Sequence, residues 1–328
     1  MAPGRLLLLD SATLYYRAFH ALPTSLVGPD GLPNNAVRGF CDALPALVSA
    51  AGASHLACAW DVDWRPAWRV SLWPGYKSNR LQAAAVDGGA AAEELPDDLA
   101  PQVDTISALL DSAGLARVGA AGFEADDIIA TLAARWPGEV VIVTSDRDLL
   151  QCVTDDGRVR LLSMARGLSN LQWFDAAAVQ ERHGVPAQRY ADFATLRGDA
   201  SDGMPGVPGI GEKTAAALVS RWASLPDLLA AALDPGADLT PRVRRALVEA
   251  SALIPAWAEV TRARTDVDVR ALGPHSASLG TALASPGVAD SIEQLTALPR
   301  TPGQRWEHAA RAAGAERAVA KWRSALVV

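Results

Sequence analysis

The sequence predicts an α/β protein with a mainly parallel central sheet flanked by helices, followed by a smaller helical domain. Short apolar runs, of the kind that form strands buried on both faces, alternate with helical patterns. The runs lie at about 5–9, 55–60 and 140–144, and the helical patterns at about 35–50, 102–113 and 124–136. This alternation is typical of βαβ units in a parallel sheet. After Val185 the signals become helical, with short loops rich in glycine and proline.

Length and composition exclude several classes of protein. The 328 residues suffice for one large domain and a smaller one. No apolar run approaches the ~20 residues that cross a bilayer, and the first residues lack the features of a signal peptide, so we expect a cytoplasmic protein. Cys41, Cys58 and Cys152 are scattered, which indicates reduced, partly buried thiols. The scattered histidines suggest neither a zinc site nor a catalytic triad.

An aspartate stands at the end of each predicted strand. Asp10 closes "RLLLLD", Asp61 closes "HLACAWD" and Asp146 closes "VVIVTSD". In an open parallel sheet the carboxyl ends of the strands share the edge at which ligands bind. Carboxylates gathered there repel one another unless cations neutralise them, and Mg²⁺ and Mn²⁺ prefer oxygen ligands. The pattern therefore predicts a divalent metal site at this edge.

Six further carboxylates fall in the same neighbourhood. They are Glu124, Asp126 and Asp127 in "GFEADD", Asp148 in "TSDRD", and Asp199 and Asp202 in "GDASDG". Each motif alone is explained as a charged helix terminus or a surface turn. Together with three acids at strand ends, they favour a metal site. Setting these nine acids aside takes the net charge from −7 to +2, so the rest of the molecule is mildly basic, as binding to nucleic acid requires.

The window from 64 to 80, "WRPAWRVSLWPGYKSNR", is the most basic and most aromatic of the chain, and it contains no acid. Lys77 and Arg80 would neutralise charge on a reacting phosphate; the alternative is a solvated helix face. For the tryptophans, packing against the sheet and stacking on bases are equally open. The stretch after Arg80, to about residue 100, is rich in alanine, glycine and acids, and predicts a mobile connection.

The stretch "PGVPGIGEKTA", residues 205–215, predicts a phosphate-binding hairpin. A Gly-x-Gly turn that opens a helix presents backbone N–H groups and a positive helix end to an anion. The full pattern is that of helix-hairpin-helix modules, which hold DNA phosphates. The expected DNA-binding residues are Gly206, Gly209, Ile210, Gly211, Lys213 and Thr214. A linker at 233–241 and an arginine-bearing helix follow.

Taken in order, the motifs resemble the 5′ nucleases, which are the flap endonucleases and the 5′-to-3′ exonuclease domain of bacterial DNA polymerase I. The resemblance covers about residues 5–270, through "LLLLDSATLYYRAFHAL", "WDVDWRPAWR", "GYKSNR", "GFEADDIIA", "TSDRDLLQ" and "LRGDASDGMPGVPGIGEKTA". It implies that the nine acids hold two, at most three, Mg²⁺ or Mn²⁺ ions, and that a monovalent cation such as K⁺ binds at the hairpin. By the same resemblance, the basic residues that handle the scissile phosphate or the 5′ strand are Arg17, Arg69, Lys77 and Arg80.

The chemistry that follows is phosphodiester hydrolysis, in which two ions activate a water and stabilise the leaving oxygen. We assign the first ion chiefly to Asp10, Asp61, Glu124 and Asp126, and the second chiefly to Asp146, Asp148, Asp199 and Asp202, with the bridging ligands left open. The expected substrates are DNA with 5′ flaps, nicks or 5′ ends, and RNA-DNA primers. We expect a monomer associated with the bacterial nucleoid, free-standing because no polymerase follows.

We divide the chain into a nuclease domain at 1–184 with an arch region at about 64–100, a helix-hairpin-helix region at 185–272, and a helical extension at 273–328. Two departures from the family pattern stand out: Gly203 in "SDG", where the family usually has "SDN", and the additional Asp63. A PIN-type ribonuclease, which also gathers acids at strand ends, and a non-catalytic helix-hairpin-helix protein remain the alternatives. A haloacid-type phosphatase is disfavoured because Ala12 stands where its second aspartate would be.

Overall fold

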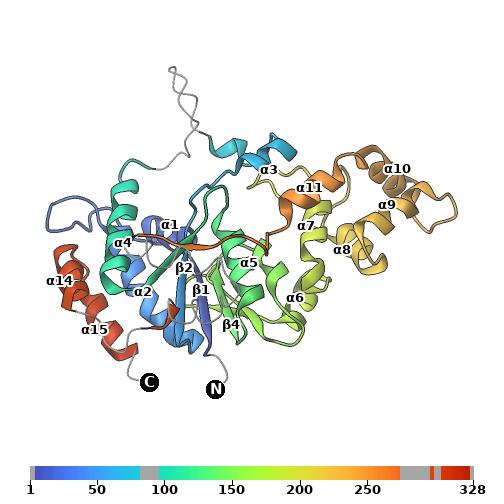
Figure 1. Ribbon diagram of the computed structural model, residues 1–328. Coiled ribbons are helices and arrows are strands. Elements are labelled where there is room, and N and C mark those ends of the chain that lie inside the picture. Colours follow the sequence, from blue (N-terminus) through green and yellow to red (C-terminus); the bar gives the residue numbers. More distant parts are fainter. Residues whose placement is uncertain (1–3, 82–95, 274–295, 299–303, 326–328) are drawn as a thin grey trace, which may run out of the picture.

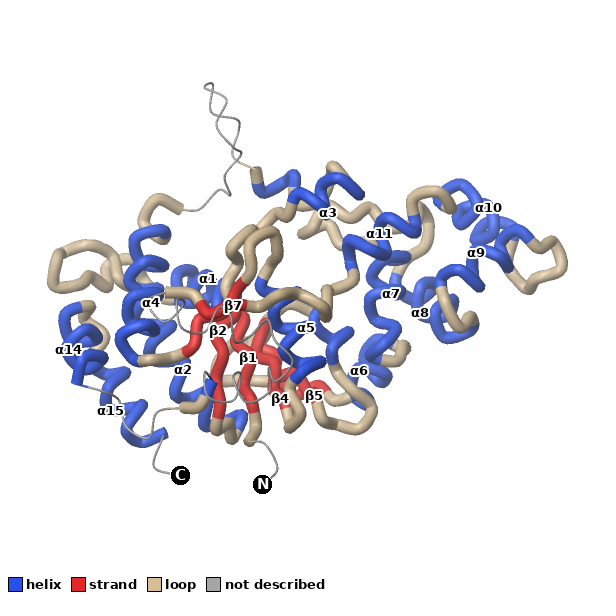
Figure 2. The backbone as a smooth tube through the Cα atoms, in the orientation of Figure 1, coloured by secondary structure: helices blue, strands red, loops and turns tan. Residues whose placement is uncertain are grey.

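A seven-stranded sheet lies at the centre of the molecule, in the order β6-β5-β4-β1-β2-β3-β7 (Figure 2). The computed structural model describes residues 4–81, 96–273, 296–298 and 304–325. The strands are β1 Leu6–Asp10, β2 His55–Ala59, β3 Ala116–Gly119, β4 Val140–Thr144, β5 Val159–Ser163, β6 Gln172–Phe174 and β7 Arg270–Ala271. β1 to β5 pair in parallel, and β6 and β7 add antiparallel edges. The predicted mainly parallel sheet is confirmed.

Helices cover both faces of this sheet and form a second group that projects from one side (Figure 1). Around the sheet lie α1 Ser11–Ala21, α2 Asn35–Ala51, α3 Ala67–Leu72, α4 Ala100–Ala113, α5 Ala125–Arg135 and α6 Ala176–His183. The second group comprises α7 Tyr190–Arg197, α8 Glu212–Arg221, α9 Leu225–Leu233, α10 Pro241–Ala250 and α11 Ile254–Thr261. Short 3₁₀ turns span Ser78–Arg80, Asp148–Cys152 and Ala187–Arg189.

The leucine run of β1 is buried on both faces, as its composition predicted. Leu6 and Leu8 belong to the core on the side of α5, and Leu7 and Leu9 to the core on the side of α1, α2 and α4. Alternate side chains of a strand point to opposite faces, so a strand between two helical layers must be apolar throughout. The carboxylate of Asp10 ends this strand at the open edge of the sheet.

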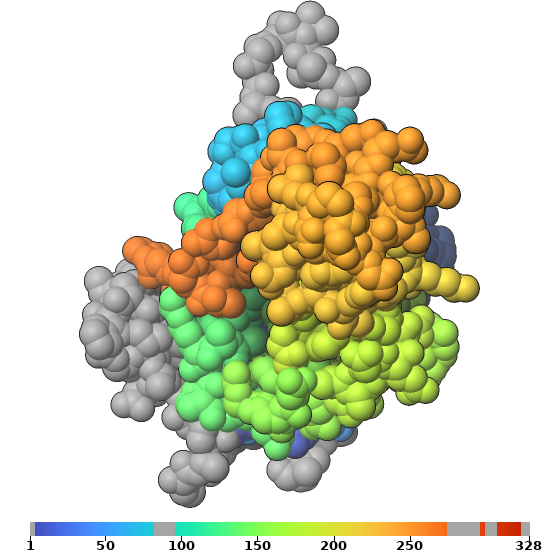
Figure 3. All heavy atoms as spheres, turned by 90° about the vertical axis from the view of Figure 1, so that its right-hand side faces the viewer, coloured from blue at the N-terminus to red at the C-terminus, as the bar shows by residue number. Residues whose placement is uncertain are grey.

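The second group of helices faces the viewer in Figure 3. From α11 the chain crosses back to the sheet, where Val118 of β3 pairs with Ala271 of β7. Taken singly, no helix in the described part of the chain is long and apolar enough to cross a membrane; α8 and α9 meet that criterion only together, across a bend of 95°.

Two further helices, α14 Gln304–Ala312 and α15 Glu316–Ala325, pack against α4 and α2. Trp322 of α15 is buried among apolar residues. The Lys321 ammonium lies 3.0 Å from Asp42 of α2, and Asn34 donates a hydrogen bond of 3.1 Å to the carbonyl of Ala313. These helices therefore pack on the helical layer that covers one face of the sheet. The predicted mobile connection falls largely on 82–95, outside the described residues.

Candidate active site

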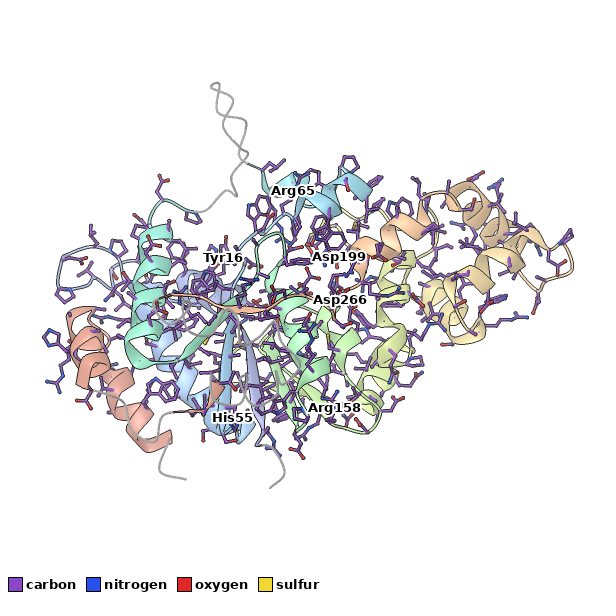
Figure 4. The ribbon with its side chains drawn as sticks, viewed as in Figure 1. Tyr16, His55, Arg65, Arg158, Asp199 and Asp266 are labelled. Atoms are coloured by element: carbon purple, nitrogen blue, oxygen red, sulfur yellow. The ribbon has the colours of Figure 1, made fainter. Side chains whose placement is uncertain are left out.

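The carboxyl ends of the parallel strands surround a cavity of about 430 Å³, here called the carboxylate cavity. Its charged lining residues are Asp10, Asp61, Glu124, Asp126, Asp146 and Asp199, with Lys77, Arg80 and Arg147. Figure 4 shows Asp199 and Tyr16 toward this upper end of the sheet, and His55 at the opposite end. The structure thus brings together six of the nine predicted acids and two of the four predicted basic residues.

Asp10 is fixed by the start of the helix that follows it. One carboxylate oxygen accepts a hydrogen bond of 3.0 Å from the backbone N–H of Thr13, which makes Asp10 the N-cap of α1. The other oxygen accepts hydrogen bonds from the hydroxyls of Thr13 and Thr144, the second at 2.7 Å. The buried carboxylate is therefore held in one orientation, with lone pairs left toward the cavity.

Asp61 and Asp126 approach the cavity through the N-terminus of α5. The backbone N–H of Ala125 donates to Asp61 at 2.8 Å, so the helix end holds a residue from the loop after β2. Asp126 stands in the first turn of the same helix and lines the cavity. Both carboxylates therefore line the carboxylate cavity beside the start of α5.

Glu124 is surrounded by donors. Its carboxylate accepts from Lys77 and Arg69 and, at 2.6 Å, from the hydroxyl of Tyr76. Although burial lowers the pKa of the Lys77 ammonium, the Glu124 charge raises it above its ordinary value. Lys77 is therefore a buried, charged group that faces both Glu124 and the cavity.

Two of the predicted site residues, Asp127 and Arg69, are paired with each other and do not line the carboxylate cavity. The Arg69 guanidinium donates to both oxygens of Asp127, at 2.8 and 2.7 Å, and to the Val260 carbonyl at 3.0 Å. Asp127 also accepts from the backbone N–H of Arg264 at 2.8 Å. Arg69 is only 3% exposed, and Asp127 is fully buried. Asp127 is thus paired with protein groups outside the carboxylate cavity, whereas Arg69 also lines the smaller cavity beside it. The roles predicted for these two residues stay predictions.

The remaining acids come from the loop after β4 and from residues 199–204. Asp148 and Asp202 line a smaller adjoining cavity, which Asp126 and Asp199 also line. One carboxylate oxygen of Asp148 is buried without a hydrogen-bond partner. Such an orphaned acceptor is costly in a folded protein, and a cation would satisfy it.

Burial and mutual repulsion make these acids hard to ionise. Loss of hydration among the acids raises the pKa of Asp61 to about 7. The same effect, with the charge of Asp202, raises the pKa of Asp146 to about 6, although Asp146 is exposed. For Asp126 and Asp148, burial and the charge of Asp146 raise the pKa well above its ordinary value. Divalent cations bound among these acids would offset both the loss of hydration and the mutual repulsion, and so lower the raised pKa values.

The acids as they stand are spread around the cavity walls. Within the ranges that the structure describes, no three Asp, Glu, His or Cys side chains stand close enough together to hold one ion. Several are instead turned to protein partners: Asp10 to threonines, Glu124 to Lys77, and Asp202 to Arg80 at 2.7 Å. The all-oxygen set and the orphaned Asp148 oxygen still fit hard divalent ions, which would draw these side chains inward.

Arg17 and Asp63 do not line the carboxylate cavity, and the role predicted for Arg17 stays a prediction. Arg17 lines a separate, mostly apolar cavity of about 610 Å³ beside α1 and α2. Arg17 stands four residues after Thr13 on the same side of α1, but its side chain lines this other cavity, whereas Thr13 lines the carboxylate cavity. Asp63 accepts a hydrogen bond of 3.2 Å from the backbone N–H of Arg65.

Sequence reasoning missed Tyr16, Trp64 and Arg147 as lining residues of the carboxylate cavity. Tyr16 stands three residues after Thr13 in α1, and that helical spacing is the signal that could have found it. Arg147 lies between two candidate ligands in "SDRD", and its guanidinium is 3.6 Å from Asp199. The tryptophans divide: Trp64 faces the cavity, whereas Trp73 packs edge-on against Trp257 of α11.

The hairpin before α8 also divides into exposed and buried residues. Gly209, Gly211 and Lys213 are exposed, and Thr214 is half-buried. Gly206 and Ile210 are buried, and the part in DNA binding predicted for them stays a prediction. A Cβ on Gly206 would stand 2.5 Å from backbone atoms of Arg197 and Gly198, so this glycine allows two chain segments to touch.

An acid-lined cavity at the strand ends of a mainly parallel sheet, joined to a helical domain that opens with a Gly-x-Gly hairpin, defines a metal-dependent nuclease. Residues 5–184 match the family described as 5′-3′ exonuclease, N-terminal resolvase-like domain, and residues 185–277 match 5′-3′ exonuclease, C-terminal SAM fold. The chain belongs to the 5′-3′ exonuclease family. The resemblance seen in the sequence, and the 5′ nuclease activity predicted from it, are confirmed.

Relatives and solved structures agree with this. The chain is 47% identical to a 5′-3′ exonuclease of Streptomyces coelicolor, over 88% of this chain and 98% of the relative, and 45% identical to one of Mycobacterium tuberculosis, over 91% and 99%. A Mycobacterium bovis DNA polymerase I is 42% identical over 70% of this chain and 24% of the polymerase. The phage T5 D15 protein crystallised with metal ions shares the fold, with a TM-score of 0.59 at 17% identity over 88% and 97% of the two chains.

Proposed function

We propose that this chain hydrolyses phosphodiester bonds of DNA at 5′ flaps, nicks and 5′ ends, using two divalent ions held by the carboxylate cavity. The observation that supports the proposal is that acidic side chains outnumber basic ones in the lining of that cavity. Six carboxylates and three basic side chains line it. Alone, this set repels a phosphate; two divalent cations would reverse the sign of the net charge and admit one.

Asp10, Asp61, Glu124 and Asp126 would hold one ion, and Asp146, Asp148, Asp199 and Asp202 the other. When bound, the ions supply an activated water and a charge that stabilises the leaving oxygen. Lys77 and Arg80 lie on the wall of the same cavity and would hold the phosphate in place. Mg²⁺ and Mn²⁺ both suit this all-oxygen set, and a K⁺ ion at the hairpin belongs to the same proposal.

The exposed hairpin residues Gly209, Gly211 and Lys213 would hold the unbroken duplex through its phosphates. We propose the same division as before: a nuclease body to residue 184, a duplex-binding region at 185–272, and a C-terminal extension. Primer removal, replication and repair in the bacterial cytoplasm, by a monomer near the nucleoid, are the proposed setting.

A cleavage assay tests the proposal. Flap, nicked and RNA-primed duplexes of matched sequence, and a single-stranded RNA, are incubated with Mg²⁺, Mn²⁺ or EDTA. We expect metal-dependent release from 5′ ends of the duplexes. Preferential cleavage of the single-stranded RNA would favour a PIN-type ribonuclease, and tight duplex binding without cleavage would favour a non-catalytic DNA-binding protein.

A further inference from the structure

Two segments that carry functional side chains are joined through their backbones. We call residues 199–204 the acid loop and residues 73–80 the basic segment. The backbone N–H of Lys77 donates to the Asp202 carbonyl at 2.9 Å, and the Trp73 indole N–H donates to the Gly203 carbonyl at 2.9 Å. Asn79 donates to the Ser201 carbonyl at 3.3 Å. These bonds connect the acids of the second ion to the residues that would hold the phosphate.

The closest approach lies between Gly203 and Gly75. Gly203 has a φ of +66°, and a Cβ on it would stand 2.2 Å from the carbonyl oxygen of Gly75. No real Cβ sits so close to a backbone atom, so any side chain at this position would push the two segments apart. The Gly75 carbonyl is itself held in place, because it accepts hydrogen bonds from the backbone N–H of Ser78 at 3.2 Å and from the Ser78 hydroxyl at 3.0 Å.

The acid loop is closed upon itself, so a displacement at Gly203 would move its acids. The N–H of Asp199 donates to the Met204 carbonyl at 2.9 Å, and the N–H of Met204 donates to the Asp199 carbonyl at 2.8 Å. Met204 is anchored in the core. Asp199 and Asp202 are thus carried by one small rigid turn that rests on the basic segment.

The other side of the contact is also constrained. Among the residues that the structure describes, Lys77 is the one non-glycine residue with a positive φ, at 48°. A left-handed backbone at such a residue costs free energy and persists only where the surroundings hold it. Here the Lys77 N–H is held by the acid loop while its ammonium is held by Glu124.

We propose that Gly203 is a positioning residue, which sets the acids of the second ion against Lys77 and Arg80 by allowing the two backbones to touch. The inference rests on the proposed two-ion function and adds a requirement specific to this chain. An asparagine, usual in the family at this place, accepts a left-handed backbone. It is nevertheless excluded here by its Cβ, which would collide with the Gly75 carbonyl.

The test compares Gly203→Asn with Gly157→Asn. Gly157 also has a positive φ, +71°, but no atom lies within 4 Å of a Cβ built on it, so it is matched for backbone strain without the collision. Binding of Mn²⁺ is titrated without DNA, and duplex affinity is measured in EDTA. We expect Gly203→Asn to weaken Mn²⁺ binding by ~10–100-fold, as loss of support around metal ligands typically does. Its duplex affinity should stay within about twofold of wild type, and its cleavage rate should recover partly as Mn²⁺ is raised.

Trp73→Phe keeps the ring beside Trp257 but removes the N–H donated to Gly203, so it decides the matter if Gly203→Asn does not fold. It should weaken Mn²⁺ binding in the same direction. If both Gly203→Asn and Trp73→Phe bind Mn²⁺ as wild type does, or if Gly157→Asn weakens it equally, Gly203 has no positioning role. Failure of the wild-type protein to cleave DNA would instead overturn the proposed function.

Discussion

The guanidinium of Arg69 and the carboxylate of Asp127 form a two-pronged ion pair, at 2.8 and 2.7 Å, that is almost closed to solvent. Replacing Asp127 leaves the buried Arg69 guanidinium with one carboxylate partner, Glu124, instead of two. We expect Asp127→Asn to lower the free energy of unfolding by about 1.5–3 kcal/mol, as the loss of hydrogen bonds to a charged group does. Urea denaturation in EDTA measures this loss.

The exposed pair of Arg245 and Glu249 on α10 provides the control. Arg245→Ala should change the stability by less than about 1 kcal/mol. Mn²⁺ affinity of folded Asp127→Asn should equal that of wild type. A variant that is stable but has lost a metal ion would return Asp127 to the set of ligands.

Asp146→Asn and Asp148→Asn should lose activity and keep their stability, the opposite of what we expect for Asp127→Asn. Each removes one ligand charge from the proposed second ion, so single-turnover cleavage should fall by about 100-fold or more. Duplex affinity and folding should be retained, because repulsion among the acids is relieved. Near-normal cleavage by both variants would contradict the two-ion mechanism.

The raised pKa values predict how the stability of the metal-free protein depends on pH. Asp61 and Asp146 have pKa values of about 7 and 6 in the folded protein, above the ordinary value of 3.8. A raised carboxyl pKa stabilises the fold while the group is protonated, and this contribution is lost as the pH rises through the folded pKa. In EDTA, the Tm should therefore fall between about pH 4 and pH 7, the interval between the ordinary and the raised pKa values.

Mg²⁺ should counteract that fall, because it binds the ionised acids of the native state only. The measurement is a series of thermal melts at constant ionic strength, with Mg²⁺ or EDTA. An Asp61→Asn protein should show a weaker pH dependence in EDTA. A Tm that rises across this pH range without metal would mean that the acids are already neutralised by the protein.

Lys77→Ala and Arg80→Ala should have different effects, although the sequence analysis predicted the same role for both residues. Lys77 is buried against Glu124, whereas the Arg80 side chain is 37% exposed. Arg80→Ala should reduce the single-turnover rate far more than duplex affinity, because it acts on the reacting phosphate. Lys77→Ala should also lower the stability, since it leaves Glu124 with one cation fewer. Equal losses of rate and affinity in Arg80→Ala would identify a simple steering charge.

The hairpin is best tested at Gly211. No atom lies within 4 Å of a Cβ built there, and its φ is −89°, so Gly211→Ala should fold normally. The added methyl group would stand where a phosphate approaches the backbone, so duplex affinity should fall. Lys213→Ala should reduce the slope of log Kd against log salt by about 1. Mn²⁺ affinity should not change in either variant; its loss with normal duplex binding would make the hairpin a support of the active site.

The sequence predicted the sheet and most of the cavity for identifiable reasons. A buried parallel strand must be apolar along its whole length, so the run from Leu6 to Leu9 predicts such a strand. The topology of a parallel sheet then fixes the edge at which the carboxyl ends of the strands lie. β3, β5, β6 and β7 were not predicted, and β7 has only two residues, too few to carry a pattern. The partner of Asp127 could not be predicted either: "EADD" shows which acids share a helix turn, but only the fold reveals that Arg69 pairs with one of them.

β7 gives the duplex-binding helices a second attachment. The chain leaves the sheet after β6 at one edge and returns as β7 at the other, so helices α7 to α11 are tied to the nuclease body at both ends. A segment fastened twice cannot swing about a single hinge. We therefore expect the distance from the hairpin to the cavity to be constant and to set the position of cleavage. Lengthening the 5′ flap should then leave the cleaved bond at the same nucleotide, counted from the duplex.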